Sequence, residues 1–180
     1  VLRTKGSPIF LEQTDLKKGK TGIESKVSGF KEAYLKYFQR QAPKASELKT
    51  ILKTDPKHAW IEGFGALGIG VNAKAASAAA DLAEQNILVR GIGEDFGGFK
   101  PLNEKDMFDC EYWSLEQAKL GKGSPPMFQG KVVVVTGGAG TIGLATANKF
   151  KQNGAEVIIL DNDRKKIKDL KILNTFESLY

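Results

Sequence analysis

The sequence predicts an α/β protein with a mixed region over residues 1–120, a linker at 121–130, and the first β-α-β of a parallel sheet over 131–180. Three observations support this prediction. Apolar residues recur at helical spacing in the first region, a Pro-Pro pair flanked by glycines interrupts the chain, and a run of four valines then begins a strand-turn-helix pattern. A β-branched run of this kind is typical of a strand buried on both faces of a parallel sheet.

The composition excludes several classes of protein. Apolar residues make up 41% and charged residues 27% of the 180-residue chain, as in folded globular proteins. The net charge of +6 is spread along the chain, and its densest basic run, 164–168, is typical of a solvated helix face, so no nucleic-acid partner is expected. No apolar run reaches the roughly 20 residues of a membrane span, so no membrane partner is expected.

Cysteine and histidine are each present once. Cys110 alone cannot form an intramolecular disulfide or a Cys-x-x-Cys zinc site, which suits a reducing, cytoplasmic compartment. His58 alone argues against a self-contained multi-histidine metal centre, and we interpret it as structural. The first residue is not Met and no signal-peptide pattern follows, so the chain is expected to be processed or to be an internal piece of a longer protein.

The start of the first region predicts a short extended segment, a polar loop and a long helix. Residues 8–11 are apolar and extended, and the Lys- and Gly-rich residues up to 22 predict a loop. Between Ile23 and Gln41, apolar residues at steps of three and four form one helical stripe: Val27, Phe30, Tyr34, Tyr37 and Phe38. Pro43 is expected to end this helix.

The rest of the first region predicts a hairpin and two helices. Residues 58–71 have the pattern of two short strands around a glycine-rich turn. Residues 73–90 are rich in Ala, Leu and Glu and predict a helix, followed by a glycine-rich loop over 91–101. Asn103 resembles a helix start, and a second helix is expected over 104–120.

The sequence pattern that indicates a ligand-binding site follows the linker. A valine strand is followed by a glycine-rich turn, a helix to about Asn153, and a second apolar strand that ends at Asp161. The glycines at positions 138, 140 and 143 match G-x-G-x-x-G, and this context favours a dinucleotide site of the Rossmann type. A Walker-type loop is not expected because no Gly-Lys-Ser/Thr follows.

Each part of this pattern has an expected role. Gly138 is expected to permit the tight turn, Gly140 to let the backbone approach a pyrophosphate, and Gly143 to let the helix pack closely on the strand. The helix start would direct unsatisfied N–H groups at the phosphates. Asp161 would accept hydrogen bonds from the adenosine ribose and repel a 2′-phosphate, which favours NAD over NADP. The expected cofactor-binding residues are Thr136, Gly137, Gly138, Gly140, Thr141, Ile142, Gly143, Asp161 and Asn162.

Residues 136–143 resemble the short-chain dehydrogenase/reductase signature Thr-Gly-x-x-x-Gly-x-Gly, with Thr141 in place of its middle glycine and Gly140 one position earlier. The spacing is also similar to Thr-Gly-x-x-Gly-x-x-Gly of extended, epimerase-type members. Residues 2–5, 63–70 and 108–120 resemble a bifunctional family that fuses a class II aldolase to a short-chain dehydrogenase, of the rhamnulose-1-phosphate aldolase/alcohol (lactaldehyde) dehydrogenase type.

The resemblance implies that the chain is an internal fragment, with the end of an aldolase-like α/β region at 1–120 and an incomplete Rossmann domain at 131–180. The parent is then expected to be an NAD-dependent oxidoreductase acting on a small hydroxy/aldehyde compound such as lactaldehyde, and a homo-oligomer. The family's Tyr-x-x-x-Lys pair has no match in this sequence, so no catalytic residue is expected here and the fragment should be inactive alone. Zinc ligands of the aldolase would lie before Val1.

Two alternatives remain open. The chain is either part of such an enzyme or a non-catalytic dinucleotide-binding or assembly module, and the glycine spacing also suits an extended epimerase-type enzyme acting on a nucleotide sugar. Fifty residues are too few for a doubly wound domain, so open strand edges and apolar faces are expected after the linker. The last residues, from 170 onward, are expected to continue a helix without a third strand.

Overall fold

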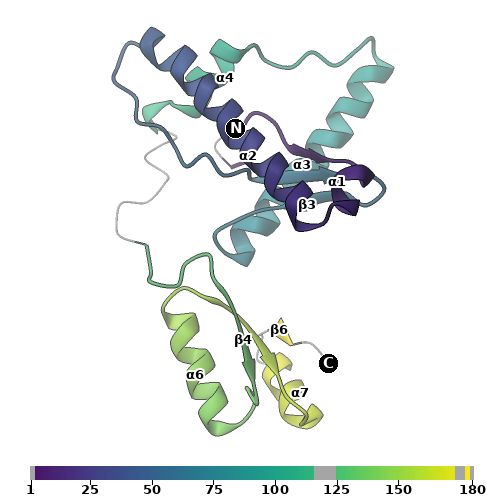
Figure 1. Cartoon of the computed structure of the whole chain (residues 1–180), viewed down its shortest axis with the longest axis vertical. Helices are drawn as coiled ribbons and strands as arrows, with labels where there is room; N and C mark the ends of the chain where they lie inside the picture. The colour runs from purple at the N-terminus through teal and green to yellow at the C-terminus, as the bar shows by residue number, and fades with distance from the viewer. Residues whose placement is uncertain (1–2, 116–124, 173–176, 179–180) are drawn as a thin grey trace. The chain divides into compact units, whose positions relative to one another are not determined.

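A computed structural model describes residues 3–115, 125–172 and 177–178. The chain forms two compact units, the first from residues 1–70 and 74–122 and the second from residues 71–73 and 123–180 (Figure 1). Both units combine helices and strands, which confirms the predicted α/β class. In the described part of the chain, none of the helices has the length and apolar character needed to cross a membrane.

The first unit contains a small three-stranded sheet with helices around it. Its elements are β1 (Ile9–Leu11), α1 (Gln13–Lys17), α2 (Lys20–Gln41), the 3₁₀ turn η1 (Ala42–Lys44), β2 (His58–Ile61), β3 (Gly65–Gly68), α3 (Ala73–Asp95) and α4 (Glu104–Glu111). The strand order is β1-β2-β3, with β1 parallel and β3 antiparallel to β2. The predicted hairpin is therefore confirmed, with Ala59 opposite Leu67.

The chain between β1 and α2 is helical, so the predicted polar loop is wrong. The backbone N–H of Glu12 donates to the Asp15 carboxylate at 3.0 Å, which caps α1 at its first turn. Gly19, with a φ of 58°, then redirects the chain, and α2 begins at the next residue rather than at Ile23. Glycine adopts this left-handed conformation without the steric cost that a side chain would add.

Helix α3 continues past its predicted end at residue 90. Gly91 and Gly93 lie inside it, and the chain leaves the helix only near Gly97 and Gly98, whose φ angles are 107° and 110°. The Gly98 N–H donates to the Gly93 carbonyl at 2.9 Å and closes the helix end. Alanines bury only the first half of α3, because Ala79 and Ala83 are buried whereas Ile87 is 41% exposed.

Helix α4 begins as predicted but ends early. The Asn103 side chain accepts a hydrogen bond from the Asp106 N–H at 2.8 Å. The helix stops at Glu111 because Tyr112 leaves the helical conformation, with its ring stacked on Phe108 at 4.4 Å between centroids. The predicted helix over 104–120 is therefore interrupted at residues 112 and 113, whereas residues 114 and 115 are again helical, and its last part, from 116, lies outside the described residues.

A buried polar cluster joins the start of the chain to α2 and α4. The Glu111 carboxylate accepts hydrogen bonds from the Tyr34 and Tyr37 hydroxyls at 2.9 and 3.2 Å. The Lys5 ammonium lies 3.4 Å from the same carboxylate and 3.7 Å from the centre of the Tyr34 ring. Burial lowers the pKa of Lys5, while the neighbouring Glu111 charge opposes that shift. The predicted aromatic stripe of α2 is thus part of the core, as expected.

The second unit is a parallel sheet with one helical layer. Its elements are β4 (Val132–Thr136), α6 (Thr141–Gln152), β5 (Glu156–Leu160), α7 (Arg164–Ile172) and β6 (Glu177–Ser178). The order β4-β5-β6 is parallel throughout, which confirms the predicted β-α-β. The expectation that no third strand follows is wrong, because Glu177 pairs with Ile158 of β5.

Strand β4 is covered on one face only, so the prediction that both faces are buried is wrong. Val132 and Val134 are 66% and 53% exposed, whereas Val133 and Val135 pack in the core. The same core includes Ala147 of α6 and residues of α7, so both helices lie on one side of the sheet. Right-handed crossovers between strands added in one direction place successive helices on the same face. The predicted open apolar face is thus present.

Residues 125–130 of the predicted linker form a turn attached to the second unit. The Phe128 N–H donates to the Asn153 carbonyl at 2.9 Å, and its ring contacts Phe150 edge-on at 5.0 Å. The Gln129 N–H donates to the Pro126 carbonyl at 3.0 Å. This turn therefore packs Phe128 against the core of the second unit.

We expect Glu111→Ala to lower the free energy of unfolding by about 3–5 kcal/mol, because it leaves the buried Lys5 ammonium without its counter-charge. Urea unfolding followed by circular dichroism measures the change. The control is Asp109→Ala, which breaks the exposed ion pair with Lys105 and should cost less than about 1 kcal/mol. Equal effects of the two substitutions would contradict a structural role for the buried pair.

Candidate dinucleotide-binding site

The turn between β4 and α6 is built from glycine backbone. Thr136 ends β4, and Gly137 has a φ of 65°, a left-handed conformation that reverses the chain. The Gly140 N–H donates to the Gly137 carbonyl at 3.1 Å and closes the turn. The sequence assigned the tight turn to Gly138, but the structure places its positive φ at Gly137 instead.

Close packing explains why positions 138 and 143 of the turn are occupied by glycine. A Cβ on Gly138 would lie 2.8 Å from Cγ2 of Ile159 in β5, so a side chain there would collide with the core. A Cβ on Gly143 would overlap the Gly137 carbonyl, so α6 packs directly on the turn. Gly143 therefore has the close-packing role that its position predicted, although its contact is with the turn rather than with the strand.

The backbone amides of the turn divide into two groups. Those at positions 138, 139 and 140 donate within the protein, to the Leu160 carbonyl at 3.2 Å, the Asp161 carboxylate at 2.9 Å and the Gly137 carbonyl at 3.1 Å. In residues 3–115, 125–172 and 177–178, no acceptor is found for the amides at 141, 142 and 143. These three N–H groups, at the positive end of the α6 dipole, form the potential anion site.

Asp161 lies at the carboxyl end of β5, and its carboxylate is oriented toward the turn. Oδ2 accepts from the Ala139 N–H at 2.9 Å and Oδ1 from the Asp163 N–H at 3.0 Å. Backbone N–H donation, first from Asp163 and then from Ala139, lowers the pKa of Asp161, so the group is charged at neutral pH. Each carboxylate oxygen has two lone pairs, so both retain capacity to accept a hydroxyl.

The other expected site residues lie around this turn. Thr136, Thr141 and Asn162 are exposed, and the Ile142 side chain is 83% exposed beside the open amides. Sequence reasoning missed Asp163, whose carboxylate accepts from the Lys165 and Lys166 N–H groups at 3.1 Å each. An Asp directly before a basic helical run was the available signal, because Asp is a favoured N-cap.

Comparison with known proteins agrees with this geometry. Residues 1–120 match the family model for the second domain of class II aldolases, and residues 131–175 match the model for short chain dehydrogenases. This chain belongs to the family that fuses a class II aldolase to a short-chain dehydrogenase. The glycine turn lies in the dehydrogenase part of that fusion.

A curated relative of this fusion chain is the uncharacterized oxidoreductase YuxG of Bacillus subtilis (strain 168). It is 31% identical over 166 residues, which are 89% of this chain and 24% of YuxG. The chain therefore spans about a quarter of the length of that relative. No solved structure matches the chain.

The aldolase-like unit shows no metal centre in its described residues. Over the described ranges of the chain, no group of three or more His, Cys, Asp or Glu side chains is arranged to hold a metal ion. His58 is buried in β2, and its Nδ1 lies 3.0 Å from the Thr4 carbonyl.

We expect Gly143→Ala to destabilise the second unit by about 1–3 kcal/mol, because the added methyl overlaps the Gly137 carbonyl and must displace α6. Urea unfolding measures the effect. Gly91→Ala is the matched control, since that helical glycine faces open space and alanine there should raise stability by about 0.5–1 kcal/mol. Stabilisation by both substitutions would show that α6 does not rest on the turn.

Proposed function

We propose that the protein to which this chain belongs is an NAD-dependent oxidoreductase acting on a small hydroxy/aldehyde compound such as lactaldehyde. This chain would supply the diphosphate and adenosine-ribose part of the NAD site. The observation that supports this proposal is the set of three open amides at the start of α6, beside a turn that Asp161 holds in place.

The residues fit a diphosphate. The N–H groups of Thr141, Ile142 and Gly143 have no acceptor in the described chain, and the helix dipole adds partial positive charge there. Gly140 presents no side chain in front of these donors. The exposed Ile142 side chain would cover an apolar part of the cofactor next to them.

The residues also fit an adenosine ribose without a phosphate. Asp161 keeps acceptor capacity for the two ribose hydroxyls, and the amides of Ala139 and Asp163 fix its orientation. A 2′-phosphate would approach a carboxylate that is already charged, so NAD is favoured over NADP.

When bound, nicotinamide exchanges a hydride with the substrate carbon. The residues of this chain bind and orient the cofactor, and no Tyr-x-x-x-Lys pair is present in the sequence to move a proton. We therefore propose that the chain binds NAD but turns over no substrate by itself. The same absence is what favours the second candidate function, a non-catalytic dinucleotide-binding or assembly module.

We also propose a cellular compartment, an oligomeric state and a metal for the parent protein. A single cysteine suits a reducing cytoplasmic compartment, and the parent is expected to be a homo-oligomer with a small-molecule substrate. Zinc is proposed as the metal of the aldolase part of the parent protein, and no residue of this chain is proposed to hold it.

The Gly140→Asp variant tests the anion site. Aspartate is a good helix N-cap, so α6 should remain folded while a carboxylate faces the open amides. We expect NADH binding, followed by nicotinamide fluorescence, to weaken at least tenfold. Thr146→Asp, at an exposed site six residues farther along the chain in α6, adds the same charge and should leave binding unchanged. Unaltered binding by Gly140→Asp would place the diphosphate elsewhere.

The Asp161→Asn variant tests the ribose site. The amide oxygen can still accept from Ala139, but the negative charge is lost. We expect NADH affinity to fall and NADPH affinity to rise, so that their ratio changes at least tenfold. Parallel fluorescence titrations with both cofactors measure the ratio, and Asp169→Asn on exposed α7 surface is the control. An unchanged ratio would remove Asp161 from the site.

A further inference from the structure

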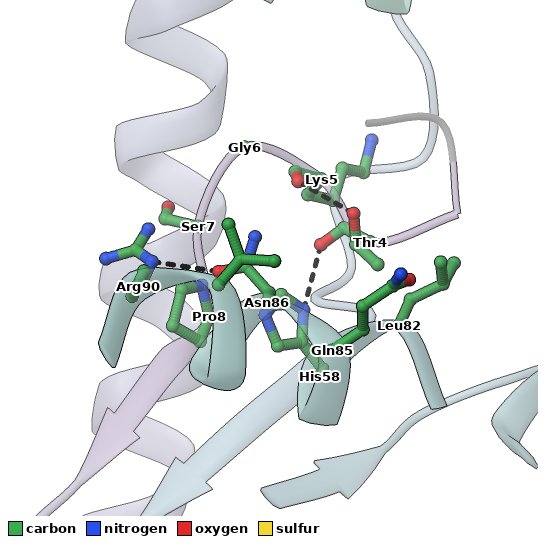
Figure 2. Close-up of a pocket in the computed structure, with 11 residues that line it drawn as sticks. Thr4, Lys5, Gly6, Ser7, Pro8, His58, Leu82, Gln85, Asn86 and Arg90 are labelled. Carbon is green, nitrogen blue, oxygen red and sulfur yellow. Dashed lines mark hydrogen bonds between the residues drawn. The ribbon is translucent and has the colours of Figure 1, made fainter. Parts of the chain in front are cut away.

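The first unit contains a groove that the dinucleotide site does not use. It has a volume of about 340 Å³ and lies between the segment before β1 and one side of α3 (Figure 2). Its polar lining residues include Thr4, Ser7, His58, Gln85, Asn86 and Arg90. No acidic side chain lines it, so its charged groups are all basic.

Arg90 is held in place but has no acidic partner. Its Nε donates to Oδ1 of Asn86 at 2.8 Å, and the guanidinium lies 5.2 Å from the Trp60 ring centre and 4.7 Å from that of Phe99. In the described part of the chain, no carboxylate lies within ion-pair distance of Arg90. An oriented guanidinium presents a planar fork of donors that matches a carboxylate or a phosphate.

His58 supplies a second group to the groove. Nδ1 lies 3.0 Å from the Thr4 carbonyl, so this nitrogen carries the proton and donates it (Figure 2). For Nε2, the described residues offer no hydrogen bond. Burial lowers the pKa of His58, with the Arg90 charge acting in the same direction and the Thr4 bond opposing it. The ring is thus neutral at pH 7 and can take up a proton when an anion arrives.

Neighbouring charged side chains do not neutralise the positive charge of Arg90 in the groove. Lys5 lines the groove, but its ammonium is paired with Glu111. Asp55 is paired with Lys31 at 2.7 Å, and Lys57 adds a further positive charge next to the imidazole in the chain. The groove therefore keeps a positive balance from Arg90.

We infer that this groove binds a small molecule carrying one oxyanion group, a phosphate or a carboxylate, together with hydroxyl groups. The anion would be held by the Arg90 guanidinium and by His58, and the hydroxyl groups by the side chains of Thr4, Ser7 and Asn86. A volume of about 340 Å³ lies at the lower end of ligand pockets, which suits a small metabolite rather than a dinucleotide.

The single histidine of the sequence makes the test direct. In the 180-residue chain, the imidazole signals in a ¹H–¹⁵N spectrum belong to His58 alone. We expect titration with inorganic phosphate, at ionic strength kept constant with sodium chloride, to shift these signals with saturation and to raise the pKa of His58. The Arg90→Gln variant should weaken this response at least tenfold, while Arg164→Gln on α7 should leave it unchanged.

A second titration with glycolate separates the two anion chemistries. Saturation by phosphate alone assigns the groove to phosphates, and saturation by glycolate alone assigns it to carboxylates. A response that does not saturate with either probe, or one that persists in Arg90→Gln, overturns the proposal. If Arg90→Gln fails to fold, Asn86→Ala removes the acceptor that orients the guanidinium and should weaken the response in the same way.

The test is independent of the dinucleotide site. The groove and the amides of α6 belong to different units of the chain, so each site can be altered by substitution without changing the residues of the other. Gly140→Asp, which should weaken NADH binding, is expected to leave the His58 response to phosphate intact. Loss of the His58 response in that variant would mean that the groove is not an independent site.

Discussion

The second unit depends on the close approach of Gly143 to the carbonyl of Gly137. This contact is possible because neither position carries a side chain, and it seats α6 directly on the turn that follows β4. The positive φ of Gly137 and the burial of Gly138 against Ile159 complete the turn. The result is a helix start whose first amides face outward, while the preceding amides bind within the protein.

The first unit is organised by charge as well as by apolar packing. The buried carboxylate of Glu111 joins Lys5 to two tyrosines of α2. Each of these tyrosines lies more than 70 residues before Glu111 in the sequence. A buried ion pair is costly to desolvate, and here the hydroxyl donors offset part of that cost. Because Lys5 lies within the segment that forms one wall of the groove, the same pair positions the groove opposite α3.

Helix α3, helix α4 and strand β4 each differ from their prediction, for separate physical reasons. Helix α3 passes through Gly91 and Gly93 because a helical glycine lowers stability only modestly, and the two positive-φ glycines at 97 and 98 end it. Helix α4 stops at Glu111 because burial of the Tyr112 ring against Phe108 outweighs a favourable helical sequence beyond it. Strand β4 has an exposed face because α6 and α7 both cover the other one.

The sequence by itself determined the α/β class, the strand-turn-helix with its glycine spacing, the acid after β5, and the apolar stripe of α2. These are local properties, set by backbone conformation and by the period of neighbouring side chains. Only the tertiary structure decided which amides stay open, where the carboxylate of Asp161 is directed, and that Arg90 and His58 line one groove. Hydrogen-bond partners and burial depend on residues distant in the chain, and no local pattern encodes them.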